Sequence, residues 1–484
     1  NEIPLGRQSF GVQAAARAYF GKDVADLQLH EAAFLAILPK APERYGRAQY
    51  ADQALERRNY VLGQMVDNGW ATPAEAAAAK AQPLGVIPRR ADSYDASVGY
   101  FVEEVRRTLI EKYGEKAEDG PNSVYAGGLW VRTSLDTQLQ KSAQDALRAG
   151  LMRYHAGRAW TKPIEHVDLS GDKWLGPLVS LNKSINYQDW RVGIVVSRSG
   201  SQATIGFADG KTAPLTGLPP ALKAGDVIAA APVGNAWAVR TIPEVSGGMV
   251  AQDPRTGRVL AMQGGFDSGL ASFNRATQAQ RQPGSTIKPF VYATGLDQGM
   301  TPASEVLDGQ FCVYQGAKLG QKCFRNFDMR GAGGTHTMRW GLEQSRNLMT
   351  VRIANDAGMD NVVKTISDVG VGKYQPFLSF ALGAGDTTVL QMTNAYAALA
   401  NNGVQFTPTL IDFVQDRNGK VIWRADTRRC NQCNMAQWDG KPMPRLGQRG
   451  KQVLDPRTAY QVVHMLEGVV TRGTAVVLRD LGLP

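Results

Sequence analysis

The sequence contains 484 residues, of which 43% are hydrophobic and 20% are charged, and its formal net charge at pH 7 is +10. A chain of this length and composition is globular, with about two to four packed domains, and is not a disordered polymer. Lysine and arginine are dispersed without a dense basic run, so the charge does not indicate a nucleic-acid-binding protein. No stretch reaches the roughly 20 apolar residues of a membrane span.

Residues 1–85 are predicted to be helical. Apolar periodicity and flanking Gly and Pro indicate helices near residues 11–20, 30–38 and 52–67. A fourth helix starts at Thr72, where Pro73 at the first helical position and Glu75 at the third form a capping box. Periodicity alone identifies this part only as a helical domain.

Residues 86–127 read as a linker with one amphipathic helix near 98–113. A strand near 128–134 and a helix from Asp136 to about residue 152 follow. Residues 153–246 then carry alternating apolar segments divided by Gly, Pro, Asp and Asn turns, which predicts a small β-barrel. Aromatic and basic residues do not alternate there, so a spacer or a protein contact is favoured over a nucleic-acid-binding barrel.

The region from residue 247 begins with a predicted hairpin over 249–262 and then reaches Ser285 and Lys288. Pro283 and Gly284 break the preceding chain, and the apolar positions that follow have helical spacing. Pro289 is tolerated only in a first turn, so Ser285 is expected at or just before a helix N-terminus with Lys288 on the same face.

This pair suggests nucleophilic catalysis. A lysine that is partly desolvated near the positive end of a helix has a lowered pKa, so that a neutral Lys288 could take the proton of Ser285. Backbone N–H groups at the helix start could hold an oxyanion. Taken alone, the spacing is more typical of a serine that caps a helix and a solvated lysine than of a catalytic pair.

A second motif, Ser345-Arg346-Asn347, lies between two helix-like segments, 337–344 and 348–354. Together with this motif, the segments Arg281–Tyr292 and Glu343–Arg352 closely resemble the penicillin-binding proteins, whose Ser-x-x-Lys motif carries the nucleophile. The resemblance covers nearly the whole chain. It is to class A enzymes of the 1A type, which are bifunctional peptidoglycan glycosyltransferases and D-Ala-D-Ala transpeptidases.

The resemblance implies a multidomain fold. Residues 1–85 would be the C-terminal part of an all-α, lysozyme-like glycosyltransferase domain, followed by the linker 86–127 and the start of the transpeptidase region at 128–152. An OB-like β-barrel insertion would occupy 153–246. Residues 247–484 would form an α/β (α+β) transpeptidase domain of the serine β-lactamase type, truncated before a Lys-Thr-Gly or Lys-Ser-Gly motif.

The resemblance also implies the chemistry. Ser285 would attack the carbonyl between two D-alanines of a stem peptide, Lys288 would take its proton, and Ser345 and Asn347 would relay protons and position the substrate amide. The partners would be peptidoglycan stem peptides, lipid-linked disaccharide, β-lactams and possible outer activator proteins. No cofactor or nucleic acid is expected. The protein would act at the periplasmic face of the inner membrane, held by an N-terminal anchor upstream of Asn1.

In such glycosyltransferases both catalytic glutamates would precede Asn1, so none is assigned here. Glu2 and Glu31 stand at other motif positions and fit solvated or capping carboxylates. Arg58 is a candidate contact for the lipid-linked pyrophosphate.

The five histidines show no metal-binding spacing, and no metal site is assigned to them. The four cysteines occur as Cys312 and Cys323, and as Cys430 and Cys433. Two pairs of thiolates could bind zinc, or all four could be reduced. The oxidising periplasm that the resemblance implies favours local disulfides, Cys312 with Cys323 and Cys430 with Cys433.

The sequence leaves two alternative functions, a serine β-lactamase and a non-catalytic penicillin sensor or cell-wall scaffold. A serine β-lactamase would need a glutamate after the second motif, and none occurs between Leu348 and Leu466. A non-catalytic penicillin sensor or cell-wall scaffold would not need all four motif residues. The third motif is missing, because Lys211-Thr-Ala213 lacks the glycine and Arg255-Thr-Gly257 precedes Ser285. Residues 1–484 alone are therefore expected to be inactive, and the longer natural product active.

Overall fold

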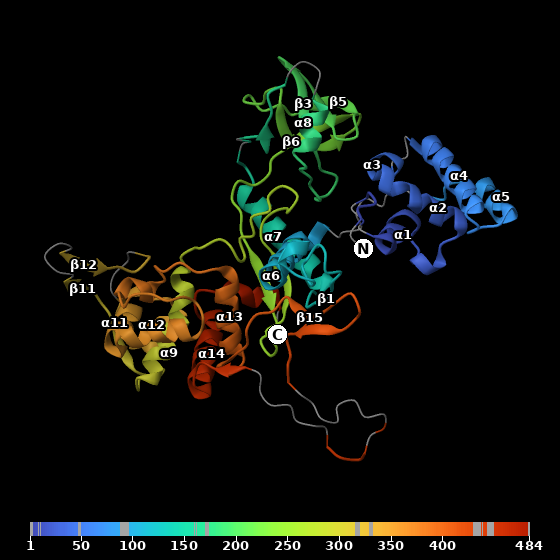
Figure 1. Ribbon diagram of the computed structural model, residues 1–484. Coiled ribbons are helices and arrows are strands. Elements are labelled where there is room, and N and C mark those ends of the chain that lie inside the picture. Colours follow the sequence, from blue (N-terminus) through green and yellow to red (C-terminus); the bar gives the residue numbers. More distant parts are fainter. Residues whose placement is uncertain are drawn as a thin grey trace. The chain divides into compact units, whose positions relative to one another are not determined.

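The computed structural model describes residues 3–7, 9, 11–46, 50–87, 96–158, 160, 162–169, 174–314, 320–328, 333–428, 437, 439–442 and 450–482. The chain forms two compact units (Figure 1). The first contains Asn1–Asp95, Arg106–Trp130 and Gln415–Lys420, and the second contains Ala96–Val105, Val131–Val414 and Val421–Pro484.

The first unit is helical, as predicted. Its helices are α1 (Val12–Phe20), α2 (Leu29–Ile37), α3 (Pro42–Tyr45), α4 (Ala51–Asp67) and α5 (Pro73–Ala81). The predicted capping box at α5 is present, because the Thr72 hydroxyl accepts the Glu75 N–H and the Glu75 carboxylate accepts the Thr72 N–H. Tyr19, Phe34 and Leu38 are at most 1% exposed and form part of the core.

The long connection after α5 contains α6 (Gly99–Tyr113) and β1 (Trp130–Thr133). Helix α7 (Thr137–His155) begins where predicted, since the Asp136 carboxylate accepts the N–H groups of Gln138 and Leu139. Gln140 of α7 is fully buried and exchanges two hydrogen bonds with the backbone of Met262. This exchange ties α7 to the hairpin of the second unit.

The predicted barrel is confirmed. Five strands close on themselves in the order β6-β3-β4-β5-β7, with β7 pairing again with β6, and β2 adds to β6. The strands are β2 (Glu165–His166), β3 (Arg191–Ser199), β4 (Gln202–Phe207), β5 (Thr212–Thr216), β6 (Asp226–Val233) and β7 (Ala236–Arg240), with α8 (Leu175–Ser180) beside them. The inward residues Val195, Ile205 and Phe207 are buried, as the alternating pattern requires.

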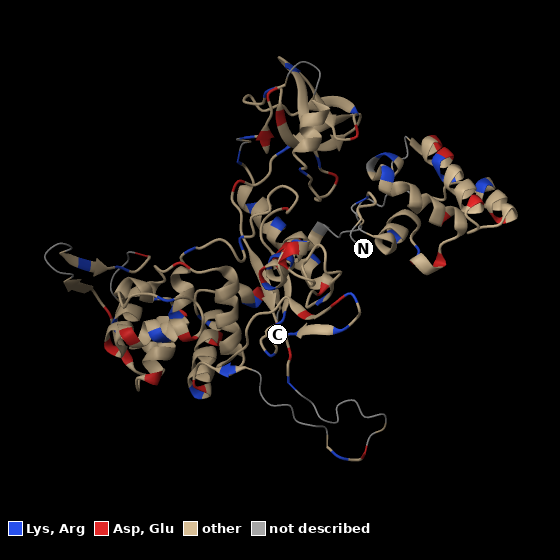
Figure 2. Ribbon diagram, viewed as in Figure 1, with Lys and Arg blue, Asp and Glu red and all other residues tan. Residues whose placement is uncertain are grey.

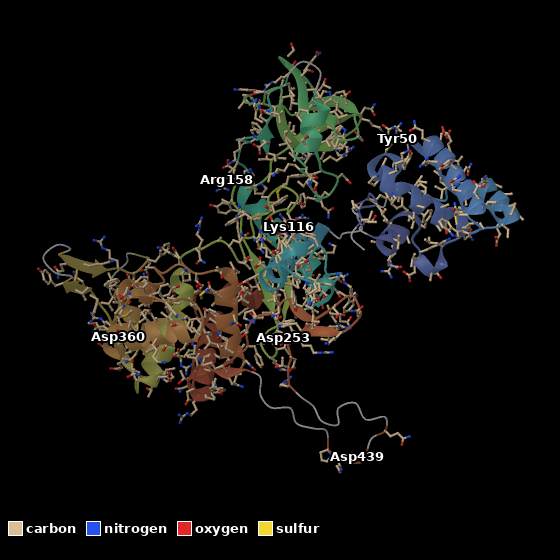
Figure 3. The ribbon with its side chains drawn as sticks, viewed as in Figure 1. Tyr50, Lys116, Arg158, Asp253, Asp360 and Asp439 are labelled. Carbon is tan, nitrogen blue, oxygen red and sulfur yellow. A yellow bond between two sulfur atoms is a disulfide. The ribbon has the colours of Figure 1, made fainter. Side chains whose placement is uncertain are left out.

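The region from residue 247 is an α/β arrangement. The hairpin of β8 (Met249–Gln252) and β9 (Val259–Gln263) turns at Asp253, which is labelled in Figure 3. Its helices are α9 (Lys288–Asp297), α10 (Met338–Glu343), α11 (Asn347–Ala357), α12 (Met359–Asp368), α13 (Val389–Ala400) and α14 (Pro456–Thr471). They share the largest apolar core of the molecule, which includes Phe290, Val291, Met349, Ile353 and Met465.

Smaller strands complete this region. They are β10 (Glu305–Asp308) with β13 (Gly334–Thr337), β11 (Phe311–Tyr314) with β12 (Gln321–Phe324), β14 (Val404–Gln405) with β17 (Lys451–Gln452), and β15 (Ile411–Gln415) with β16 (Val421–Arg424).

Cys312 and Cys323 stand opposite each other in the β11–β12 hairpin and form a disulfide, so this predicted pairing is confirmed. The predicted Cys430–Cys433 pair lies outside the described residues.

Positive and negative side chains are interspersed along both units (Figure 2), as expected from the dispersed sequence charge. Within the described ranges, none of the helices combines the length and apolarity needed to cross a bilayer.

Candidate active site

Ser285 lies in a short 3-10 turn, Gly284–Ile287, that leads into α9. The α-helix itself begins at Lys288 with Pro289 in its first turn, so Ser285 lies just before the helix N-terminus, within the predicted placement. Gly284 has a φ of +58°, and its N–H donates to the Gly383 carbonyl at 3.3 Å. A Cβ on Gly383 would lie 2.2 Å from the Gly284 oxygen, so the two glycines allow a close backbone contact that holds the turn. The Ser285 side chain is exposed at this turn.

Lys288 is buried and hydrogen-bonded to the second motif. Its side chain is 1% exposed, so burial goes beyond the partial desolvation that the sequence suggested. The ammonium Nζ donates to the Ser345 carbonyl at 2.6 Å, to Ser345 Oγ at 3.1 Å and to Asn347 Oδ1 at 2.7 Å. Burial, and to a lesser extent the nearby Arg346 charge, lowers the pKa of Lys288 to about 8.

Ser345 stands in the tight junction between α10 and α11. Its φ of +53° places a non-glycine residue in the left-handed region, which costs about 1 kcal/mol or more. The junction is closed by two backbone bonds, from the Ser345 N–H to Leu342 and from the Arg346 N–H to Gly341. This conformation directs both the carbonyl and the hydroxyl of Ser345 to Lys288.

Asn347 is the first residue of α11, and its amide is held at both ends. Oδ1 accepts from Lys288, while Nδ2 donates to the Arg325 carbonyl at 3.0 Å. A flipped amide would place its NH2 group against the ammonium and its oxygen against a carbonyl, so the hydrogen-bond partners define one orientation.

The structure thus brings Lys288, Ser345 and Asn347 into direct contact and places Ser285 in the 3-10 turn that directly precedes Lys288. Among the described residues, the hydrogen bonds of Lys288 Nζ go to the second motif and none goes to Ser285. An apo site of this kind often tightens only when substrate is bound.

A cavity of about 1000 Å³ borders the nucleophile turn. Pro283 and Thr286, which flank Ser285, line one side, and α13 residues including Met392 and Tyr396 line another. The Tyr396 hydroxyl donates to the Thr286 carbonyl at 2.9 Å, which fixes the wall against the turn. The cavity lining does not include Ser285, Lys288, Ser345 or Asn347, so this space adjoins the nucleophile turn without containing the nucleophile.

The expected pyrophosphate contact of Arg58 is not supported. Arg58 is fully buried, and all five of its N–H donors are bound within the protein: to Asn59 Oδ1 twice and to the carbonyls of Lys80, Gln82 and Pro83. These carbonyls end α5, where a cation is electrostatically favoured. The side chain has a structural role and no donor remains for a ligand.

The remaining residues that the sequence analysis discussed have local structural roles. Glu31 is 5% exposed; its carboxylate caps α2 at Gln28 and pairs with Lys22, whereas Glu2 lies outside the described residues. Lys211–Ala213 opens β5 of the barrel, and Arg255–Gly257 forms the β8–β9 turn, so neither triplet lies at the nucleophile. Within the described ranges, no three His, Cys, Asp or Glu side chains converge on a common point as a metal site would require.

Sequence reasoning missed the residues that support the second motif. Arg346 donates to Asp308, which is fully buried, and to Asp328, while Asn326 accepts backbone N–H groups of α11. Arg346 could have been suspected as the central residue of the motif. Asp308 and Asn326 carry no local signal, because Asp308 lies 38 residues before Arg346 and Asn326 lies 21 residues before Asn347.

Comparison with known proteins agrees with this geometry. Residues 247–482 match the family described as the penicillin-binding protein transpeptidase domain, and residues 1–66 match the family described as transglycosylase. The chain is 36% identical over 499 residues to penicillin-binding protein 1A of Rickettsia prowazekii (strain Madrid E), which covers 100% of this chain and 62% of that relative. It is 33% identical over 496 residues to penicillin-binding protein 1A of Neisseria lactamica, covering 98% of this chain and 59% of the relative.

A solved structure agrees as well. The crystal structure of penicillin-binding protein 1A from Haemophilus influenzae is similar with a TM-score of 0.71 and 28% sequence identity, over 99% of this chain and 74% of that chain. The chain spans 62% of the length of the Rickettsia relative.

Proposed function

Because the chain belongs to the class A penicillin-binding proteins, we propose that it carries the acyl-transfer site of a peptidoglycan transpeptidase. Ser285 is the nucleophile, Lys288 is its base, and Ser345 and Asn347 complete the site. The whole protein cross-links D-Ala-D-Ala stem peptides and reacts with β-lactams. Its glycosyltransferase domain polymerises lipid-linked disaccharide.

The proposed cellular setting follows from the same family. The whole protein acts at the periplasmic face of the inner membrane, held by an anchor outside residues 1–484, and outer proteins regulate it.

The hydrogen bonds around Lys288 account for its role as a base. The Ser345 carbonyl and Asn347 Oδ1 can only accept, so they take two N–H groups of a neutral amine and leave its lone pair for a hydroxyl. A pKa of about 8 leaves roughly a tenth of the amines neutral at pH 7, roughly 300-fold more than for an unperturbed lysine.

In the acylation step, Ser285 Oγ forms a bond to the donor carbonyl carbon as the amide C–N bond breaks. The proton of Ser285 passes to Lys288 and from there, directly or through the Ser345 hydroxyl 3.1 Å away, to the leaving D-alanine amine. An amine of a second stem peptide then attacks the ester and restores Ser285. The proton lost by Ser285 leaves with the D-alanine amine, and the attacking amine supplies the proton that restores the Ser285 hydroxyl.

The observation that carries this proposal is the contact of a buried lysine with both residues of the second motif, one turn after an exposed serine. The test is labelling of the full-length protein with a fluorescent penicillin. We expect Ser285→Ala to abolish labelling, because no acyl bond can form. The matched control is Thr286→Ala, which removes the neighbouring hydroxyl of the same turn and should leave labelling intact. Labelling that persists in Ser285→Ala contradicts the proposal.

The β-lactamase alternative lacks support in the structure. Glu467, the first glutamate after the second motif, lies on the exposed face of α14 and accepts from His464 at 2.8 Å. Glu343 is buried but paired with Arg472 through two hydrogen bonds. Neither carboxylate is available to activate water at Ser285.

A further inference from the structure

The start of α11 is capped by a residue from elsewhere in the chain. The first N–H groups of a helix lack intrahelical partners, and the side chain of Arg346, the N-cap residue, does not accept any of them. Asn326 supplies the missing acceptor: its Oδ1 accepts the N–H of Asn347 at 2.9 Å and the N–H of Leu348 at 3.2 Å. The first turn of α11, which carries the amide next to Lys288, therefore depends on Asn326.

Asn326 is itself held from its other end. Its Nδ2 donates to Asp308 Oδ1 at 2.8 Å, and the second oxygen of Asp308 accepts from Arg346 Nε at 2.7 Å. Asp308 is fully buried and can only accept, whereas the α11 N–H groups can only donate. The Asn326 amide therefore has a single satisfactory orientation, and it links a buried carboxylate to the helix start.

The residue before Asn326 completes the arrangement. The Arg325 carbonyl accepts from Asn347 Nδ2, which turns Asn347 Oδ1 to Lys288. Two consecutive residues thus hold Asn347, one by its backbone and the other by its side-chain amide.

The segment that carries them has an independent anchor. It directly follows β12, whose Phe324 is buried against Leu348 and Val351 of α11. The disulfide Cys312–Cys323 ties β12 to β11. Removal of the Asn326 side chain should therefore leave the hairpin in place.

We propose that Asn326 is a positioning residue for Lys288: it holds the first turn of α11 so that Asn347 and Ser345 keep the amine in its reactive orientation. This inference rests on the function proposed above for Ser285 and Lys288. A helix cap alone stabilises the helix that it begins and would not change the chemistry of a lysine on another helix. A displacement of a catalytic group by about 1 Å, in contrast, costs about 100-fold in rate.

Two variants of the full-length protein distinguish a residue that positions Lys288 from one that only caps α11. Asn326→Ala removes the acceptor and the donor, whereas Asn326→Asp keeps an oxygen that caps α11 as well as asparagine does but faces Asp308 with a second carboxylate. If Asn326 positions Lys288, the second-order rate of acylation by a fluorescent penicillin falls at least tenfold in both variants. If it only caps the helix, Asn326→Asp keeps the wild-type rate, and the proposal is overturned.

The pH profile of acylation between pH 6 and 10 gives a second readout. In Asn326→Ala the ammonium loses a well-placed acceptor, so the limb of the profile that Lys288 controls should move to lower pH by half a unit or more. The charged groups that act on Lys288 are Arg346 and, through it, Asp308 and Asp328, and all remain in this variant. A lower rate with an unshifted limb contradicts the proposal.

Asp455→Ala, which removes the N-cap of α14, is the matched control. It should lower the melting temperature but change neither the acylation rate nor the pH of the limb that Lys288 controls. Failure of the wild-type protein to label at Ser285 would overturn the proposed function and this inference together. Normal wild-type labelling with unchanged Asn326 variants would overturn this inference alone.

Discussion

The helical unit buries the cationic side chain of Arg58 and the second unit buries that of Lys288, and the hydrogen-bond partners of the two charges differ in kind. Arg58 of the helical unit gives all five N–H donors to acceptors that belong mainly to the end of α5. Lys288 of the second unit donates to three oxygens of one motif, and one of these is a hydroxyl that can also donate. Burial lowers the pKa of both side chains.

The difference shows why one buried cation is structural and the other is reactive. A guanidinium stays charged under all physiological conditions, so the Arg58 site can only bind and hold. An ammonium whose pKa is about 8 exchanges its proton near neutral pH, and a hydroxyl beside it offers a path for that proton. The chemistry of the partner atoms, more than burial itself, decides the role.

The largest effect should come from replacing the reactive cation. In Lys288→Met the aliphatic stem still fills the buried space, but the base is gone, so the rate of Ser285 acylation should fall by about 10³-fold. Lys288→Ala should lose acylation as well, but it also opens a cavity, because Lys288 is buried and not a surface residue. The test is to measure acylation rates by labelling with a fluorescent penicillin, quenched at timed intervals. Circular dichroism checks that each variant is folded. A Lys288→Met protein that is acylated at the wild-type rate would falsify the assignment of the base.

Replacing Arg58 should lower the stability of the protein and leave the rate of Ser285 acylation unchanged. Arg58→Ala leaves three carbonyls and Asn59 without donors in a buried place, which should lower the free energy of unfolding by about 3–5 kcal/mol. Arg58→Lys should recover only part of this, since an ammonium has three donors. Urea unfolding measures the loss, and labelling of Ser285 should stay at the wild-type rate.

The neighbouring Arg57, half-buried and in contact with the Tyr60 ring, is the matched control, and Arg57→Ala should change stability by about 0.5 kcal/mol or less. A stable Arg58→Ala protein would show that Arg58 is free to serve a ligand after all.

The smallest expected effect is a pH dependence of the free energy of unfolding that Lys288 causes and Arg58 does not. Burial lowers the pKa of Lys288 from 10.5 to about 8, so between these values the unfolded chain binds a proton that the folded protein has released. The free energy of unfolding should therefore rise with pH from 8 to 10.5, by up to about 3 kcal/mol, and this gain is lost as the pH falls from 10.5 to 8. Urea unfolding at pH 8, 9 and 10 should show that Lys288→Met lacks this rise, whereas Arg58→Met retains it. An identical slope in the wild type and Lys288→Met contradicts the lowered pKa.

Local features of the fold could be predicted from the sequence because they depend on neighbouring residues. The capping box at Thr72 and Glu75, the N-cap at Asp136 and the inward positions Ala203, Ile205 and Phe207 of β4 all appear where expected. The position of Ser285 just before α9 could also be predicted, since Pro289 marks the first turn of that helix, whereas the 3-10 geometry of the preceding turn gives no separate signal.

The sequence by itself determined the reactive pair and the second motif, because Ser285 with Lys288 and Ser345 with Asn347 are each set by short spacings on a helix start. Only the tertiary structure decided what these residues contact. Lys288 meets a motif 57 residues away, Asn347 is oriented by a carbonyl 22 residues before it, and Arg58 is bound by the end of another helix. The physical reason is that burial and hydrogen-bond geometry depend on which surfaces pack together, and that packing follows from the apolar core of each unit and not from the residues beside the motif.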